Sequence, residues 1–217
     1  MADTHVLPAR TDGINWQAHA HVDRFSADQS AFAEARIDPS LVPNSREWNA
    51  ALAALLRSTG APEDGTYDEP GNLLVTEGLN QLTQLIIGSG GVSFNGTHGL
   101  IAVGDSSTGA AVGDTYVTAT FTSGSNCYQN PNDNTFPTQS NGLMTSQSTF
   151  GSSVANFAWN TWGWAVYNGT AAANATLSAH GTGSNQAVLV NHKVPSSSIG
   201  TKGSGSSWIF TTTVTLS

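Results

Sequence analysis

The stretch Ser207-Trp-Ile-Phe-Thr-Thr-Thr-Val-Thr-Leu216 decides the fold class of this 217-residue chain. Apolar residues and threonines alternate along it with a period of two, which is the period of side chains on a β-strand. The stretch therefore predicts a long strand. One of its faces would carry Trp208, Phe210, Thr212, Val214 and Leu216.

Five earlier stretches have the same character, and turns rich in Gly, Asn and Ser separate them. Six or more strands of this kind predict a mainly β fold, an antiparallel sandwich or barrel with one helix packed at its edge. The five further candidate strands are Leu100–Val103, Tyr116–Thr122, Leu143–Phe150, Phe157–Tyr167 and Ala187–Lys193.

The packed helix is predicted to begin at a Thr76 cap and to end at Gly88, where the flexible stretch 88–91 opens. Leucines and an isoleucine line one side of this segment, so we expect it to cover a sheet. Its apolar side consists of Leu79, Leu82, Leu85 and Ile86.

Two shorter helices are expected nearer the start of the chain. Ser26 can cap a helix over residues 27–36. Asn44 and Glu47 form a capping pair for a second helix, whose apolar stripe begins at Trp48.

The remaining N-terminal residues show no helical period, and residues 1–25 are expected to form an extended arm. Residues 60–71 are acidic and rich in Pro and Gly, which is typical of a linker or an exposed loop. We therefore predict two parts: an N-terminal arm with two short helices and an acidic linker over residues 1–70, and a β-sandwich domain over residues 71–217.

Charge is concentrated in the first 77 residues, which hold 12 of the 15 acidic and 5 of the 7 basic residues. A surface of hydroxyls and amides offers few acids, bases or metal ligands. It suits a chain that packs against copies of itself or another protein, where an unpaired buried charge is costly. After Glu77 the only charged residues, histidines aside, are Asp105, Asp114, Asp133, Lys193 and Lys202.

Several classes of partner are excluded by composition. The net charge is −8 and no basic stretch is present, so direct nucleic-acid binding is not expected. No apolar run approaches the roughly 20 residues that cross a bilayer, and no signal peptide is indicated.

Cys127 is the only cysteine, so neither an intrachain disulfide nor a cysteine-based metal site can form.

Local motifs for chemistry are weak. His19-x-His21 places two imidazoles on one face of a strand, but no third metal ligand lies nearby. Gly104-Asp105-Ser106-Ser107 sets a serine beside an acid without the G-x-S-x-G elbow, so a capped turn is the better interpretation. We assign no catalytic, cofactor-binding or metal-binding residue.

An aromatic cluster lies between residues 157 and 167. Alternation puts Phe157 and Trp159 on one face and Trp162 and Trp164 on the other, with a bulge at Asn160 and Thr161. One face should be core, and the other a subunit interface or a carbohydrate platform. We favour core plus interface.

A series of short motifs follows in order along the chain from residue 16 onward. They are Trp16-Gln-Ala-His-Ala-His-Val22, Gly71-Asn-Leu-Leu74, Gly78-Leu-Asn80, Ile101-Ala-Val-Gly-Asp-Ser-Ser-Thr108, Ser148-Thr-Phe-Gly151, Asn156-Phe-Ala-Trp-Asn160, Asn191-His-Lys-Val194 and Ile199-Gly-Thr-Lys-Gly-Ser-Gly205. In these motifs and their order the chain resembles virion proteins of tailed bacteriophages of the actinobacterial kind, over most of its length from residue 16. The resemblance implies a structural component of the virion without catalytic residues, on the head or on the tail.

The expected function is that of a capsid decoration or minor capsid protein, made in the host cytoplasm and located on the virion. Its partners would be the major capsid protein or neighbouring virion proteins, with the chain itself oligomeric and its 1–70 arm as anchor. A tail or baseplate protein and a glycan-binding attachment module are the alternatives. The predicted interface anchors are Trp16, Phe25, Phe32, Trp48, Trp162 and Trp164.

Overall fold

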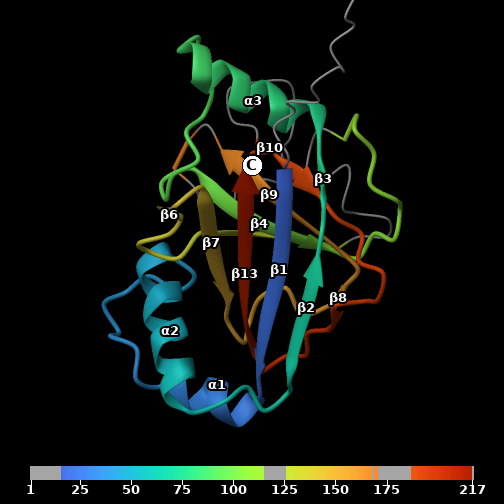
Figure 1. Ribbon diagram of the computed structural model, residues 1–217. Coiled ribbons are helices and arrows are strands. Elements are labelled where there is room, and N and C mark those ends of the chain that lie inside the picture. Colours follow the sequence, from blue (N-terminus) through green and yellow to red (C-terminus); the bar gives the residue numbers. More distant parts are fainter. Residues whose placement is uncertain (1–15, 115–125, 168, 171–186, 217) are drawn as a thin grey trace, which may run out of the picture.

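Two antiparallel sheets packed face to face form the body of the protein (Figure 1). The computed structural model describes residues 16–114, 126–167, 169–170 and 187–216, so the predicted strand Tyr116–Thr122 lies outside the described residues. The mainly β, antiparallel sandwich with helices that the sequence predicts is confirmed.

The first sheet has five strands in the order β2 (Thr66–Pro70), β1 (Trp16–Phe25), β13 (Ser207–Leu216), β7 (Leu143–Phe150) and β6 (Thr138–Ser140). The second has four, in the order β10 (Ala187–Leu189), β9 (Thr161–Tyr167), β4 (Gly99–Gly104) and β5 (Cys127–Pro131). Two short pairs complete the described strands: β11 (Asn191–His192) with β3 (Leu73–Leu74), and β12 (Gly200–Thr201) with β8 (Ala158–Trp159).

The main hydrophobic core lies between the two sheets, and Trp159 is at its centre. Its ring centroid is 4.8 Å from that of Phe150 and 4.7 Å from that of Trp208. Phe210 joins the same cluster from β13, whereas Ile209 points to the opposite face of the sheet. The alternation predicted for residues 207–216 is thus the reason that β13 can pack on both faces.

Two helices cover part of the outer face of the five-stranded sheet (Figure 1). α1 (Ala27–Glu34) begins at the predicted cap, because the Ser26 side chain accepts from the amide of Gln29 and the Gln29 side chain bonds back. α2 (Arg46–Ser58) is capped by Ser45 rather than by Asn44. A separate apolar cluster joins the helices to the sheet and contains Phe25, Ala33, Leu52, Ala53, Leu56 and Ile209.

The expectation of an extended N-terminal arm is wrong from residue 16 onward, because β1 pairs within the sandwich, whereas residues 1–15 of that arm lie outside the described residues. This strand pairs with β13 over all ten of its residues and with β2 over five, and β2 lies in the segment predicted to be a linker. Residues 16–70 therefore belong to the sandwich, and the boundary at residue 70 does not separate two units. The inward-facing residues of β1 are Ala18, Ala20 and Val22, which are too small to give a strong apolar signal.

α3 (Thr76–Ile87) ends at Gly88 as predicted, in the left-handed conformation with φ 66°. Its only buried residue is Gly78, where an added Cβ would lie 2.1 Å from the carbonyl oxygen of Val190. The helix is thus attached through its first turn. The expectation that its apolar side covers a sheet is met only in part: Leu82 and Leu85 are partly buried, whereas Leu79 and Ile86 are 50% and 75% exposed.

Candidate functional site

Three of the six predicted interface anchors are core residues. Phe25, Trp162 and Trp164 are at most 1% exposed, so neither an interface nor a carbohydrate platform is available at these side chains. The expected separation of the tryptophans onto two faces is wrong. The chain breaks at Asn160 between β8 and β9, and this break turns Trp159, Trp162 and Trp164 toward the same inter-sheet core.

The other three anchors differ in their exposure. Trp16 is partly buried against the inter-sheet core. Trp48 is partly buried and packs closely on Gly151, where an added Cβ would lie 2.7 Å from the indole ring. Phe32 is 47% exposed, and the Arg36 guanidinium lies 3.3 Å above its ring. Of the six, Phe32 alone presents a large part of its ring to solvent.

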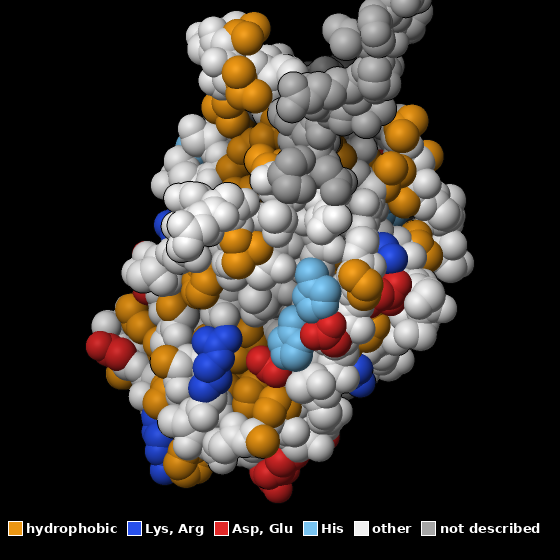
Figure 2. All heavy atoms as spheres, viewed as in Figure 1, with side chains coloured by type: hydrophobic (Ala, Val, Ile, Leu, Met, Phe, Trp, Pro, Cys, Tyr) orange, Lys and Arg blue, Asp and Glu red, His pale blue; other side chains and the backbone are white. Residues whose placement is uncertain are grey.

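A different apolar surface lies at the end of the sandwich that carries α3, and we call it the α3 end. Figure 2 shows hydrophobic side chains along the helix, with the charged side chains of this face lying below it. α3 contains a single charged residue, Glu77. Val112 lies beside its first turn, because the Val112 carbonyl accepts from the amide of Thr76 at 2.8 Å. The exposed large apolar residues of this end are Leu79, Ile86, Ile87, Val112, Leu143 and Leu216.

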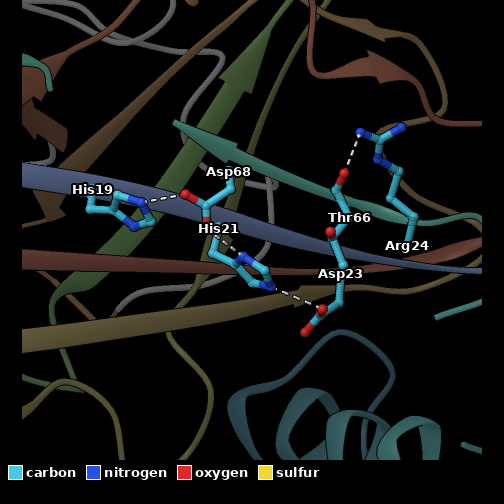
Figure 3. A network of polar contacts seen from close by, with 6 residues as sticks. All are labelled: His19, His21, Asp23, Arg24, Thr66 and Asp68. Carbon is cyan, nitrogen blue, oxygen red and sulfur yellow. Dashed lines mark hydrogen bonds and ion pairs between the residues drawn. The ribbon is translucent and has the colours of Figure 1, made fainter. Parts of the chain in front are cut away.

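A network of histidines and carboxylates lies on the exposed face of β1 and β2 (Figure 3). The register sets His21 opposite Asp68, and His19 lies on the same face two residues earlier. Asp68 accepts from both rings, with its Oδ1 2.5 Å from His19 Nε2 and its Oδ2 3.0 Å from His21 Nδ1. His21 Nε2 is also 3.0 Å from Asp23 Oδ1. The two histidines therefore clamp the edge strand β2 to β1.

The network shifts the protonation of its members. Partial burial lowers the pKa of His21, but the neighbouring carboxylates of Asp68 and Asp23 outweigh burial and the pKa is raised. The hydrogen bond from His21 holds the pKa of Asp68 below its usual range. Within the described residues, no three or more His, Cys, Asp and Glu side chains are grouped so that they could hold a metal ion.

An acid, an imidazole and a hydroxyl meet where β9 and β11 adjoin. Asp114 Oδ2 lies 2.6 Å from His192 Nδ1, and His192 Nε2 lies 2.7 Å from Thr161 Oγ1. Burial lowers the pKa of His192, although Asp114 opposes this effect. The order of groups is that of a proton relay. However, Thr161 is fully buried and His192 is 1% exposed, so a substrate does not reach the hydroxyl. No sequence motif links these three residues.

A second buried polar network ties α2 to β7. Asp133 is fully buried and accepts from the Thr149 amide at 2.9 Å, from Thr149 Oγ1 at 2.7 Å and from Gln147 Nε2 at 2.6 Å. Gln147 Oε1 accepts in turn from Arg57 of α2. Burial raises the pKa of Asp133 to about 6, although these donors oppose the effect.

Comparison of the chain with models of protein families, with curated proteins and with solved structures finds no match in any of the three. Among the described residues, no helix is both long enough and apolar enough to cross a membrane.

Proposed function

We propose that the chain is a non-enzymatic structural protein of a bacteriophage virion, a capsid decoration or minor capsid protein that assembles through its α3 end. The proposal rests on the exposed apolar row of α3, which consists of Leu79, Ile86 and Ile87, on a helix with a single charged residue. The central parts of protein interfaces are rich in apolar side chains and depleted in charge. The α3 end has both properties.

The energetic argument rests on three side chains of α3. Leu79, Ile86 and Ile87 are at least half exposed in the chain by itself. Full burial of one such side chain contributes about 1.5–3 kcal/mol. Contact with the α3 end of a second copy of the chain would recover much of this free energy at each of the three positions.

Assembly through the α3 end is proposed in place of anchoring through residues 16–70. β1, β2, α1 and α2 pack on the chain's own sandwich, so residues 16–70 are already committed to its fold. The resemblance of several motifs to actinobacteriophage virion proteins supports the choice of a virion as the assembly.

The non-enzymatic part of the proposal has its own support. The most suggestive catalytic geometry, Asp114–His192–Thr161, is closed to substrate by the burial of its hydroxyl. Ser106, the serine beside an acid, is 1% exposed. Glu69 is paired with Lys193 at 2.8 Å, which leaves it a structural role between β2 and the segment after β11.

Immunogold labelling of intact virions with antibody raised against the whole chain tests the proposal. Label distributed over the head is the expected result. Label confined to the tail would replace decoration by a tail or baseplate role. Particles without label that also lack the chain by mass spectrometry would contradict a virion role altogether.

A further inference from the structure

Lys202 is a buried lysine whose amine is surrounded by oxygen acceptors. Its side chain is 1% exposed, which is rare for a lysine. Its Nζ donates to the carbonyl oxygens of Gly151 at 2.8 Å and Val154 at 2.9 Å, and to Asn156 Oδ1 at 2.7 Å. Two of these acceptors are inert peptide carbonyls, whereas the third belongs to a side-chain amide.

The fold holds this amide against the amine. The backbone amide of Lys202 donates to the carbonyl of Phe157 at 3.0 Å, so the segments that carry the two side chains are joined directly beside them. Asn156 Nδ2 donates to the carbonyl of Ser152 at 3.1 Å, which turns Oδ1 toward Nζ. The amide carbon of Asn156 is one bond away from the oxygen that Nζ contacts.

The amine is also prepared electronically. Burial lowers the pKa of Lys202 to about 7, although the charge of Glu34 opposes this effect. Burial thus favours loss of one proton from the amine, which leaves two N–H donors and the lone pair that makes the amine nucleophilic. Holding a nucleophile and an electrophile in contact replaces a slow encounter with an intramolecular step.

A carboxylate lies next to the same segment. Glu34 accepts from the Ser152 amide at 2.9 Å and from Ser152 Oγ at 2.7 Å. Ser152 thus bonds to Glu34 on one side, and through its carbonyl to the Asn156 amide on the other. Glu34 therefore positions Ser152, and its charge acts on the Lys202 amine.

We propose that Lys202 and Asn156 condense into an intramolecular isopeptide bond. The neutral Nζ attacks Cγ of Asn156, a new C–N bond forms, and the Cγ–Nδ2 bond breaks. One proton leaves Nζ, and Nδ2 departs with a proton as ammonia. The reaction exchanges one amide for another, so it needs no oxidant, metal or cofactor.

The bond would give this chain the covalent staple that its single cysteine cannot provide. It links the segment between β7 and β8 to the segment between β12 and β13, and the two residues are 46 positions apart. A link of this kind reduces the conformational freedom of the unfolded chain. Such a staple suits a protein that must withstand mechanical or thermal stress.

Intact-mass and tryptic peptide analysis of the purified full chain tests the proposal. The expected protein is lighter than its sequence by one ammonia, trypsin fails to cleave after Lys202, and one branched peptide contains both residues. A succinimide at an Asn-Gly pair loses the same mass, so the branched peptide is the deciding signal.

Variants locate the chemistry. Lys202→Arg and Asn156→Ala should each show their full sequence mass. Asn160→Ala should keep the deficit, because the Asn160 side chain bonds to Asp105 and Ser198 instead. Folded wild-type protein with its full sequence mass and a normal tryptic cut after Lys202, after prolonged incubation at pH 8, would overturn the proposal whether or not the variants fold.

Discussion

Asp133 should make the stability of the protein fall as the pH rises from 5 to 7.5, because its carboxyl group is buried. Burial raises its pKa from 3.8 to about 6, so the folded state binds the proton more tightly than the unfolded state does. The charged form therefore destabilises the folded state above pH 6, and this penalty disappears as the pH falls toward 4. At about 1.4 kcal/mol per pKa unit, the full penalty is about 3 kcal/mol.

Urea unfolding of the wild type and of Asp133→Asn at pH 7.5 and pH 5.0 measures this effect. Between pH 7.5 and pH 5.0, only the last pH unit lies below the pKa of Asp133 in the folded state. On acidification the free energy of unfolding of the wild type should therefore rise by about 1.4 kcal/mol more than that of the variant. Other titrating groups contribute equally to both proteins and cancel in the difference. An equal change in the two proteins, or a larger gain in the variant, would refute the reasoning.

Three further perturbations probe separate parts of the fold. The wild type should lose stability as the pH rises through the raised pKa of His21, because the protonated ring pairs with Asp68. The melting temperature of the wild type should therefore fall more between pH 5.5 and pH 8 than that of His21→Gln. An equal fall in the two proteins would count against this. Phe210→Ala should lower the free energy of unfolding by about 3–5 kcal/mol in urea, and a loss under about 1 kcal/mol would be inconsistent with its place in the core. Gly78→Ala should destabilise by about 1–3 kcal/mol, because its Cβ would meet the carbonyl of Val190, whereas helix propensity alone predicts stabilisation.

The strands with large alternating side chains were predictable from the sequence. The predicted bounds of β7 and β13 are those observed, and β4 is one residue longer at each end than the predicted strand. Helix boundaries were also readable where a side chain caps the backbone, as at Ser26, or where a glycine takes a left-handed conformation, as at Gly88.

The missed features depend on distant parts of the chain. β1 alternates alanines and one valine with polar residues, and it becomes a strand because β13 and β2 pair with it on either side. The break at Asn160 was expected, but local alternation could not tell that it returns the tryptophans to one core. The contacts of Asp114 with His192 and of Lys202 with Asn156 span 78 and 46 residues, and no local pattern marks them.

The claim that the α3 end is an assembly surface is tested most directly by sedimentation velocity of the wild type and two matched charge variants. Ile86→Glu adds a charge to the exposed apolar row, whereas Gln81→Glu adds the same charge at least about 120° around the helix from Leu79, Ile86 and Ile87. The Gln81 Oε1 accepts from the Val92 amide, and a glutamate oxygen at position 81 can keep this bond. We predict that the wild type and Gln81→Glu sediment as the same oligomer and that Ile86→Glu sediments as a folded monomer. A wild type that is monomeric at all concentrations, or an Ile86→Glu variant that keeps the wild-type oligomer, would contradict the account.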